Sequence, residues 1–483
     1  MRMNNQKPLG LNAVLNAIKS SLSILFPLII YPYVFHVLHS ENIGKVNFAS
    51  SIVSYFSMFA MLGVTQYAVR EGAKIRNNKD EINKLTSEIF TINVISTIVS
   101  YVLLAVCIIS ISKLHLYSEL ILICSISIAF NTLGIEWVNT IYEDYLYITI
   151  RSIIINIISL VFIFIFVKSE DDLYIYAFLS ILGSVITGIV NWRYCRRYIR
   201  LKLTKSINFK RHFKPISILF ANALATNIYV NSDITMIGWF CGDYNVGIYV
   251  LAVKVYSVIK NIMAALYAVT VPRISYYFGA GDNEKVMELY SNLISSILLI
   301  LLPASAGIIS VAPEIIMFIG GNEYIESIVP LRILGISLIG AIFAGLLTYC
   351  LNIPLGREMI NFQATIISAL LNIGLNFVLI ELLSQNGAAI TTAISEFSVF
   401  FYCLFRSRNE IKLYVDIKRV IHYLLQSVAG VIVVITVTIC THHILGVSFV
   451  SFTIIVMSSV IVYGVLLILV KNSFVLALLK WNK

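Results

Sequence analysis

The sequence predicts an all-α polytopic membrane protein with about fourteen transmembrane helices. Of the 483 residues, 59% are hydrophobic and only 12% are charged, and the mean hydropathy is +0.88. Soluble domains are typically about 25% charged, so this chain lacks the polar surface that a water-exposed globule needs. A cytosolic enzyme, a nucleic-acid-binding domain and a disordered chain are therefore excluded.

The apolar residues form continuous runs, each close to the roughly 20 residues that one helical crossing of a bilayer needs. Such runs favour helices over the short alternating strands of a membrane barrel. The predicted spans are 12–38, 43–65, 85–110, 117–139, 146–168, 174–194, 215–240, 246–271, 288–312, 330–352, 359–382, 388–406, 420–442 and 447–470. The first run lacks a small-residue cleavage site, so we interpret it as a retained span rather than a signal peptide.

The lysines and arginines indicate how the spans are oriented. When the N-terminus is placed in the cytoplasm, 28 of the 35 positive residues fall in cytoplasmic segments, and nine of these lie in the loop 193–214. We therefore expect both termini in the cytoplasm. The net charge of +10 then reflects anchoring against an anionic lipid leaflet rather than binding to nucleic acid.

A weak internal repeat appears when the sequence is shifted by 203 residues, so that Asn42-Ile43-Gly44 matches Asn245-Val246-Gly247 and Arg70 matches Arg273. A repeat of six helices keeps both copies in the same orientation, related by a pseudo-two-fold axis along the membrane normal. The predicted organisation is an N-terminal lobe, a C-terminal lobe with a cleft between the two, and a segment with two extra helices and a tail. Their residue ranges are 1–200, 201–408 and 409–483.

Five charged residues are singled out as lying well inside the predicted spans, where a charge costs about 2.5–3.5 kcal/mol. They are Lys19, Asp233, Lys254, Lys260 and Glu396. Two interpretations remain open: ion pairs without a transport role, or a hydrated cationic cleft that attracts an anionic substrate. Glu88 and Glu136 lie closer to span ends, where we expect their carboxylates to reach water.

The cation candidates for substrate binding differ in position. Lys254 and Lys260 are six residues apart, or about 240° around a helix, so both cannot point straight into one cleft. We favour Lys254 because it lies nearer the middle of its span. Arg70 and Arg273, which the repeat aligns, are further candidates for the cationic cavity. Asp233 and Glu396 are candidates for proton coupling or for charge pairs.

The chain shows no signature of enzyme chemistry or of a bound cofactor. Its seven cysteines and seven histidines lack the spacing of metal ligands. We also find no pair of catalytic residues in a long loop and no phosphate-binding glycine-rich loop. We therefore expect a non-catalytic protein without metal or cofactor.

Three short motifs resemble those of a known family. Leu62-Gly63-Val64-Thr65-Gln66-Tyr67, followed by Arg70-Glu71-Gly72-Ala73-Lys74, is similar to the end of the second helix in bacterial polysaccharide flippases. Asn245-Val246-Gly247-Ile248-Tyr249 and Gly320-Gly321-Asn322-Glu323-Tyr324 also fit. The chain resembles the Wzx-type O-antigen flippases of the multidrug/oligosaccharidyl-lipid/polysaccharide (MOP) exporter superfamily.

The resemblance implies alternating-access transport of an undecaprenyl-pyrophosphate-linked oligosaccharide across the bacterial inner membrane, for O-antigen or related polysaccharide synthesis. The implied partners are this lipid-linked oligosaccharide, membrane lipids, a polysaccharide polymerase and a chain-length regulator. Cavity arginines are important in related flippases, whereas lysine here would bind pyrophosphate as a point charge.

Two other functions stay open. An ion-coupled multidrug exporter of the same superfamily would typically have twelve spans and a cavity dominated by carboxylates. A membrane-embedded glycosyltransferase or polymerase would need a large external loop with catalytic residues. The longest external loop expected here, 313–329, has about 17 residues.

Overall fold

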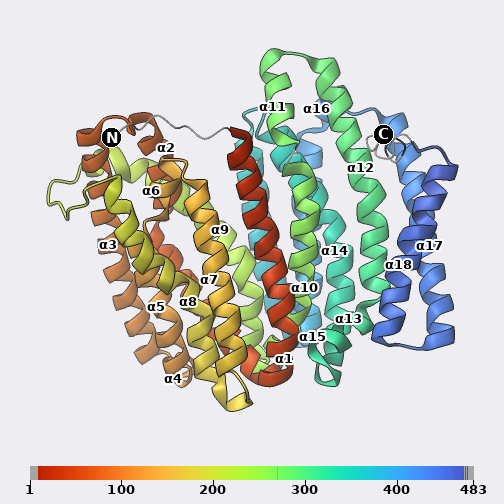
Figure 1. Ribbon diagram of the computed structural model, residues 1–483, viewed down its shortest axis with the longest axis horizontal. Coiled ribbons are helices and arrows are strands. Elements are labelled where there is room, and N and C mark those ends of the chain that lie inside the picture. The colour runs from red at the N-terminus through yellow and green to blue at the C-terminus, as the bar shows by residue number, and fades with distance from the viewer. Residues whose placement is uncertain (1–8, 269, 473, 475, 477–483) are drawn as a thin grey trace. The chain divides into compact units, whose positions relative to one another are not determined.

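Helices account for every secondary-structure element in the described part of the chain, which confirms the predicted all-α class (Figure 1). The computed structural model describes residues 9–472, 474 and 476, apart from residue 269. Side chains are described at these positions except at residues 9–25, 222 and 268. The chain forms two units, residues 1–238 and 239–483. The lobe boundaries at residues 200 and 408, which come from the repeat, stay a prediction.

The first unit contains nine α-helices in its described part, the last of which ends just beyond the unit boundary. They are α1 (Leu9–Met61), α2 (Val64–Ile75), α3 (Lys79–Ser110), α4 (Ser112–Leu116), α5 (Ser118–Gly134), α6 (Glu136–Ile141), α7 (Tyr145–Phe166), α8 (Leu173–Tyr194) and α9 (Phe209–Phe240). Within this unit, α5 packs along α8, and α1 packs against α3, α5 and α7.

The second unit also contains nine α-helices in its described part. They are α10 (Asp243–Ala268), α11 (Val271–Ala280), α12 (Asn283–Ser310), α13 (Ala312–Gly320), α14 (Ile328–Leu346), α15 (Glu358–Arg406), α16 (Arg408–Tyr414), α17 (Ile417–Leu445) and α18 (Phe449–Leu469). A π-helical turn, Leu347–Asn352, follows α14. The main packing pairs are α14 with α15 and α12 with α17.

Eleven segments of the described chain are long and apolar enough to cross a membrane. Two of them, Phe26–Ile75 and Glu358–Arg406, have 50 and 49 residues, more than twice the roughly 20 residues of one crossing. Within these segments, α1 is broken at His39 (φ 63°) and α15 at Ser384 (φ 48°). The first segment also contains the turn at Leu62-Gly63 between α1 and α2. When these two segments are divided and the 32-residue α9 is added, the described chain holds the fourteen spans that the sequence predicts.

The second break lies at the junction that the sequence predicts between spans 359–382 and 388–406. A Cβ atom at Gly387 would overlap the backbone carbonyl of Leu379, because the chain folds back closely on itself here. Only glycine fits such a close approach of two backbone segments. The two spans within α15 are therefore joined by a tight helical hairpin.

Polar residues cap several helices at the ends of the spans. The side chain of Asn78 accepts hydrogen bonds from the backbone N–H groups of Asp80 and Glu81 at the start of α3. Asp282 caps α12, and hydrogen bonds from the side chain and the backbone N–H of Lys285 hold the pKa of this carboxyl below its usual range. Such caps satisfy N–H groups that have no partner within the helix.

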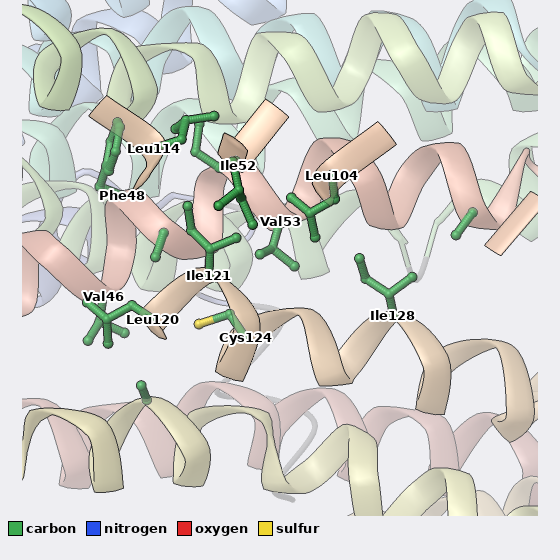
Figure 2. Close-up of a cluster of buried hydrophobic side chains, with 14 residues drawn as sticks. Val46, Phe48, Ile52, Val53, Leu104, Leu114, Leu120, Ile121, Cys124 and Ile128 are labelled. Carbon is green, nitrogen blue, oxygen red and sulfur yellow. The ribbon is translucent and has the colours of Figure 1, made fainter. Parts of the chain in front are cut away.

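An apolar cluster in the first unit joins α1, α3, α4 and α5 (Figure 2). Phe48 and Ile52 of α1 face Leu114 of α4 and Ile121 of α5, and Leu104 comes from α3. All five side chains are buried. Because lipid tails are as apolar as these side chains, close packing and polar contacts hold such helices together.

Candidate functional site

A polar cluster in the second unit joins two of the predicted site residues. The ammonium of Lys260, on α10, lies 2.5 Å from Oε1 of Glu396, on α15. The Tyr256 hydroxyl lies 3.4 Å from the same carboxylate oxygen and 3.5 Å from the hydroxyl of Ser337, on α14. We call Lys260, Glu396, Tyr256 and Ser337 the α10–α15 polar cluster.

Glycines on α14 allow aromatic side chains to lie close beside this cluster. A Cβ atom at Gly340 would lie 3.1 Å from Phe397, the residue after Glu396, and one at Gly345 would lie 2.6 Å from the Tyr267 hydroxyl. The Tyr267 ring stacks on Tyr349, with centroids 5.7 Å apart. Tyr349 belongs to the π-helical turn, and such turns are frequent at functional sites.

The ion pair changes the interpretation of Lys260. The sequence analysis counts Lys260 among the cations of a net cationic cavity, but here Glu396 neutralises its charge. The Glu396 side chain is only 8% exposed, whereas that of Lys260 is 34% exposed. An ammonium has three donors, and the Lys260 ammonium contacts both Glu396 and the Tyr256 side chain. The role of Lys260 in substrate binding stays a prediction.

The other two cation candidates in the second unit are Lys254 and Arg273. Lys254 is half-buried on α10, and Arg273 is exposed on the short helix α11. Lys254 and Lys260 are six positions apart, which turns their side chains to different sides of α10. The preference for Lys254 as a substrate-binding cation stays a prediction.

In the first unit, Arg70 is exposed and its Nε lies 2.9 Å from Glu71. Lys74 also pairs with Glu71, at 3.0 Å, so this segment carries an ion network near the end of α2. Asp233 is buried on α9. Lys19 lies within α1. The structure describes its backbone but not its side chain.

A buried triad in the first unit was not predicted from the sequence. Oε2 of Glu88, on α3, lies 2.5 Å from Nε2 of His212, on α9. Nδ1 of His212 lies 2.7 Å from the hydroxyl of Tyr67, on α2. A carboxylate oxygen only accepts, so His212 Nε2–H donates to Glu88. The protonation of the ring decides which atom donates in the hydrogen bond between His212 Nδ1 and the Tyr67 hydroxyl.

The expectation that Glu88 reaches water from a span end is therefore wrong. Its side chain is 4% exposed and that of His212 is 1% exposed. The two residues are 124 positions apart, so no local spacing in the sequence relates them. The only signal available was a carboxylate close to an apolar run.

A second buried carboxylate lies in the segment 313–329, which the sequence analysis treats as a loop. Ala312–Gly320 instead forms α13, and the fully buried carboxylate of Glu314 pairs with His442 of α17. Glu136 pairs with the buried Arg151 in the first unit and remains half-exposed. These pairs fix helix ends within each unit.

Metal ligation is not supported by the geometry of the described residues. No group of three or more His, Cys, Asp or Glu side chains among them is placed to hold a metal ion. The seven cysteines, all of which lie in described positions, are free thiols. The polar groups of the two units are arranged as pairs and hydrogen-bonded networks.

The sequence profile of one family, described as polysaccharide biosynthesis protein, matches residues 9–278. This match covers more than half of the chain. The chain belongs to the polysaccharide biosynthesis protein family. A second profile, MatE, matches residues 218–378. The family match confirms the predicted resemblance to the Wzx-type flippases of the MOP superfamily.

Two curated relatives align with this chain over nearly their full length. A proposed O-antigen transporter of Shigella dysenteriae is 23% identical over 402 residues, which are 81% of this chain and 98% of the relative. One from Escherichia coli K12 is 22% identical over 84% of this chain and 98% of the relative. These relatives are transporters rather than enzymes, which agrees with the prediction of a non-catalytic protein.

Solved structures share the fold of this member of the polysaccharide biosynthesis protein family. The lipid II flippase MurJ in an inward closed conformation has a TM-score of 0.69 at 16% identity, over 95% of this chain and 99% of that chain. An inward-facing multidrug resistance MATE transporter of the MOP superfamily has a TM-score of 0.60 at 15% identity, over 80% of this chain and 98% of that chain. The predicted fold class is thereby confirmed.

Proposed function

We propose that this protein is a polysaccharide flippase that moves a lipid-linked oligosaccharide across the bacterial inner membrane by alternating access. The observation that carries the proposal is the family match over residues 9–278, joined by relatives of full length that are proposed O-antigen transporters. The product would supply O-antigen or a related surface polysaccharide. Both termini would lie in the cytoplasm, as the distribution of lysine and arginine predicts.

The chemistry of such a substrate explains why charges lie within spans. A sugar head and a pyrophosphate cannot cross hydrocarbon unaided, so they need polar side chains along their route. Lys19, Lys254 and Lys260 would supply positive charge within the spans, and Arg70 and Arg273 would supply it near helix ends. The exposed ring of Tyr349, stacked on Tyr267, offers a flat apolar face to a sugar. Asp233 and Glu396 would couple transport to an ion gradient.

A second candidate function is the export of cationic drugs, which the MatE match over residues 218–378 favours. Such an exporter needs a carboxylate that is available to a cation. In the second unit, however, the Glu396 carboxylate is already paired with Lys260. This pairing counts against a drug exporter that binds its cation at Glu396.

The test is complementation in the organism from which the gene is deleted, with surface polysaccharide as the readout. The wild-type gene restores the polymer, and Lys254→Ala reduces it by at least tenfold while the protein remains inserted in the membrane. Lys254→Arg keeps the charge and retains most of the polymer. Lys285→Ala is the matched control, because this exposed lysine pairs only at the surface.

Three outcomes would contradict parts of this proposal. A null strain with normal surface polysaccharide would refute the flippase role. Normal polymer with Lys254→Ala would remove Lys254 from the substrate route. Loss of drug resistance in the null strain, with polymer unchanged, would establish the drug exporter instead.

A further inference from the structure

An apolar groove in the first unit lies between α1, α3 and α9. Its volume is about 370 Å³. Its walls are almost entirely hydrocarbon and include Phe59, Ile92, Val99, Leu103, Phe213 and Phe220. Val99 is 51% exposed and Phe213 is 71% exposed. The groove is therefore open at the protein surface and presents apolar side chains that the protein itself does not cover.

The length of the groove matches one leaflet of a bilayer. Its lining runs from Ile92 to Leu103 on α3 and from Phe209 to Phe220 on α9. At 1.5 Å per residue, each stretch is roughly 16 Å long. The hydrocarbon core of a bilayer is about 30 Å thick, so one leaflet is about 15 Å deep. A single lipid chain lying along α3 and α9 would fill this length.

Basic residues stand at the end of the groove where α9 begins. Lys210, Arg211 and Lys214 lie in the first two turns of α9 and are exposed. In the described part of the chain, no carboxylate forms a salt bridge with any of the three, and the loop 193–214 contains no Asp or Glu. Three positive charges thus lie in the same turns of α9 as Phe209 and Phe213, at the end of the helix where its lining of the groove begins.

His212 lies among these basic residues but is not available to a ligand. Its imidazole lines the groove, and its two nitrogens are bonded to Glu88 and Tyr67. The buried triad therefore holds the start of α9 against α2 and α3. The charge offered to a ligand comes from Lys210, Arg211 and Lys214.

We propose that this groove binds one anionic phospholipid, with an acyl chain along α3 and α9 and the phosphate beside Lys210, Arg211 and Lys214. The apolar walls match the chain, and the three cations match a headgroup with net negative charge. A zwitterionic lipid would gain only the apolar contact. The inference goes beyond the proposed transport activity and does not depend on it.

The test uses the purified full chain in detergent, titrated with phosphatidylglycerol or phosphatidylcholine while native mass spectrometry counts the bound lipid. We expect phosphatidylglycerol to bind at least tenfold more tightly than phosphatidylcholine. The triple variant Lys210→Gln, Arg211→Gln, Lys214→Gln should bind the two lipids equally. The matched triple variant Arg200→Gln, Lys202→Gln, Lys205→Gln removes the same charge from exposed residues of the same loop and should bind phosphatidylglycerol like the wild type.

A second variant tests the groove itself. Val99→Trp should fill it and weaken phosphatidylglycerol binding at least tenfold, and Ile109→Trp, at an exposed position on α3 outside the lining, should not. If Val99→Trp fails to fold, the surface charge variants still decide the question. Equal binding of both lipids by the wild type would overturn the proposal. So would displacement of the lipid by inorganic phosphate, which marks a free-anion site, or an equal loss in the matched triple variant.

Discussion

Lys260→Met should lower the stability of the second unit by about 3 kcal/mol, because it leaves the carboxylate of Glu396 buried without a counter-ion. Breaking a fully buried ion pair from one side typically costs about 3–5 kcal/mol. The lower end applies here because the Lys260 side chain is 34% exposed. The measurement is the thermal unfolding of the purified protein in detergent.

The double variant Lys260→Met, Glu396→Gln separates the ion pair from general damage to the fold. It should recover most of the lost stability, since no uncompensated charge remains in the interior. Lys285→Met is the control: its partner Asp282 is at the surface, so the unfolding temperature should hardly change. A Lys260→Met protein as stable as the wild type would show that the pair contributes nothing.

The same double variant also separates stability from transport. If it folds normally but supports no surface polysaccharide, the pair has a role in moving the substrate. If it supports normal polymer, Lys260 and Glu396 are structural, and Lys254 becomes the main cation of the second unit. Either result decides whether Lys260 belongs to an ion pair without a transport role or contributes to substrate transport.

Glu88→Ala should cost about 1–3 kcal/mol, because the Glu88–His212 pair is almost fully buried and a buried polar group left without its partner costs this much. The substitution removes the acceptor of His212 Nε2–H and leaves a polar ring inside the first unit. Glu88→Gln, which retains an acceptor oxygen, should lose less. Tyr67→Phe removes one neutral hydrogen bond and should cost about 0.5–1.5 kcal/mol.

Thermal unfolding of these three variants gives a ranked series that checks the triad. Lys45→Met breaks an exposed pair with Glu41 in the same unit and should leave the unfolding temperature nearly unchanged. An unfolding temperature for Glu88→Ala within the range of this control would mean that the triad is not maintained in the folded protein.

Hydropathy and charge predicted the elements of the fold well, because these signals depend on residues close together in the sequence. The spans meeting near His39 and Ser384 were separated correctly: the polar residues His39-Ser40-Glu41-Asn42 and Ser384-Gln385-Asn386 interrupt the apolar runs. The sequence did not show that the helices continue up to a single residue at each break. Both breaks use a non-glycine residue with positive φ, His39 and Ser384.

Contacts between distant residues were much harder to predict. Lys260 and Glu396 are 136 positions apart, and the sequence identified both as charged residues within spans without showing that they pair. Glu88 was expected to reach water, and His212 was not identified as its partner. Hydropathy indicates whether a residue lies within a span, but it does not indicate which neighbouring helix its side chain faces. The facing helix determines whether a charged side chain forms an ion pair.

The central claim is that this chain carries a lipid-linked oligosaccharide from one leaflet to the other. The most direct measurement places the purified protein in vesicles with a fluorescent lipid-linked oligosaccharide and adds a quencher that cannot cross the membrane. The claim predicts that the wild type exposes the inner-leaflet pool to the quencher, and that Lys254→Ala slows this exposure at least tenfold. An inner-leaflet pool as protected as in protein-free vesicles, with correctly folded wild-type protein and its coupling gradient present, would contradict it.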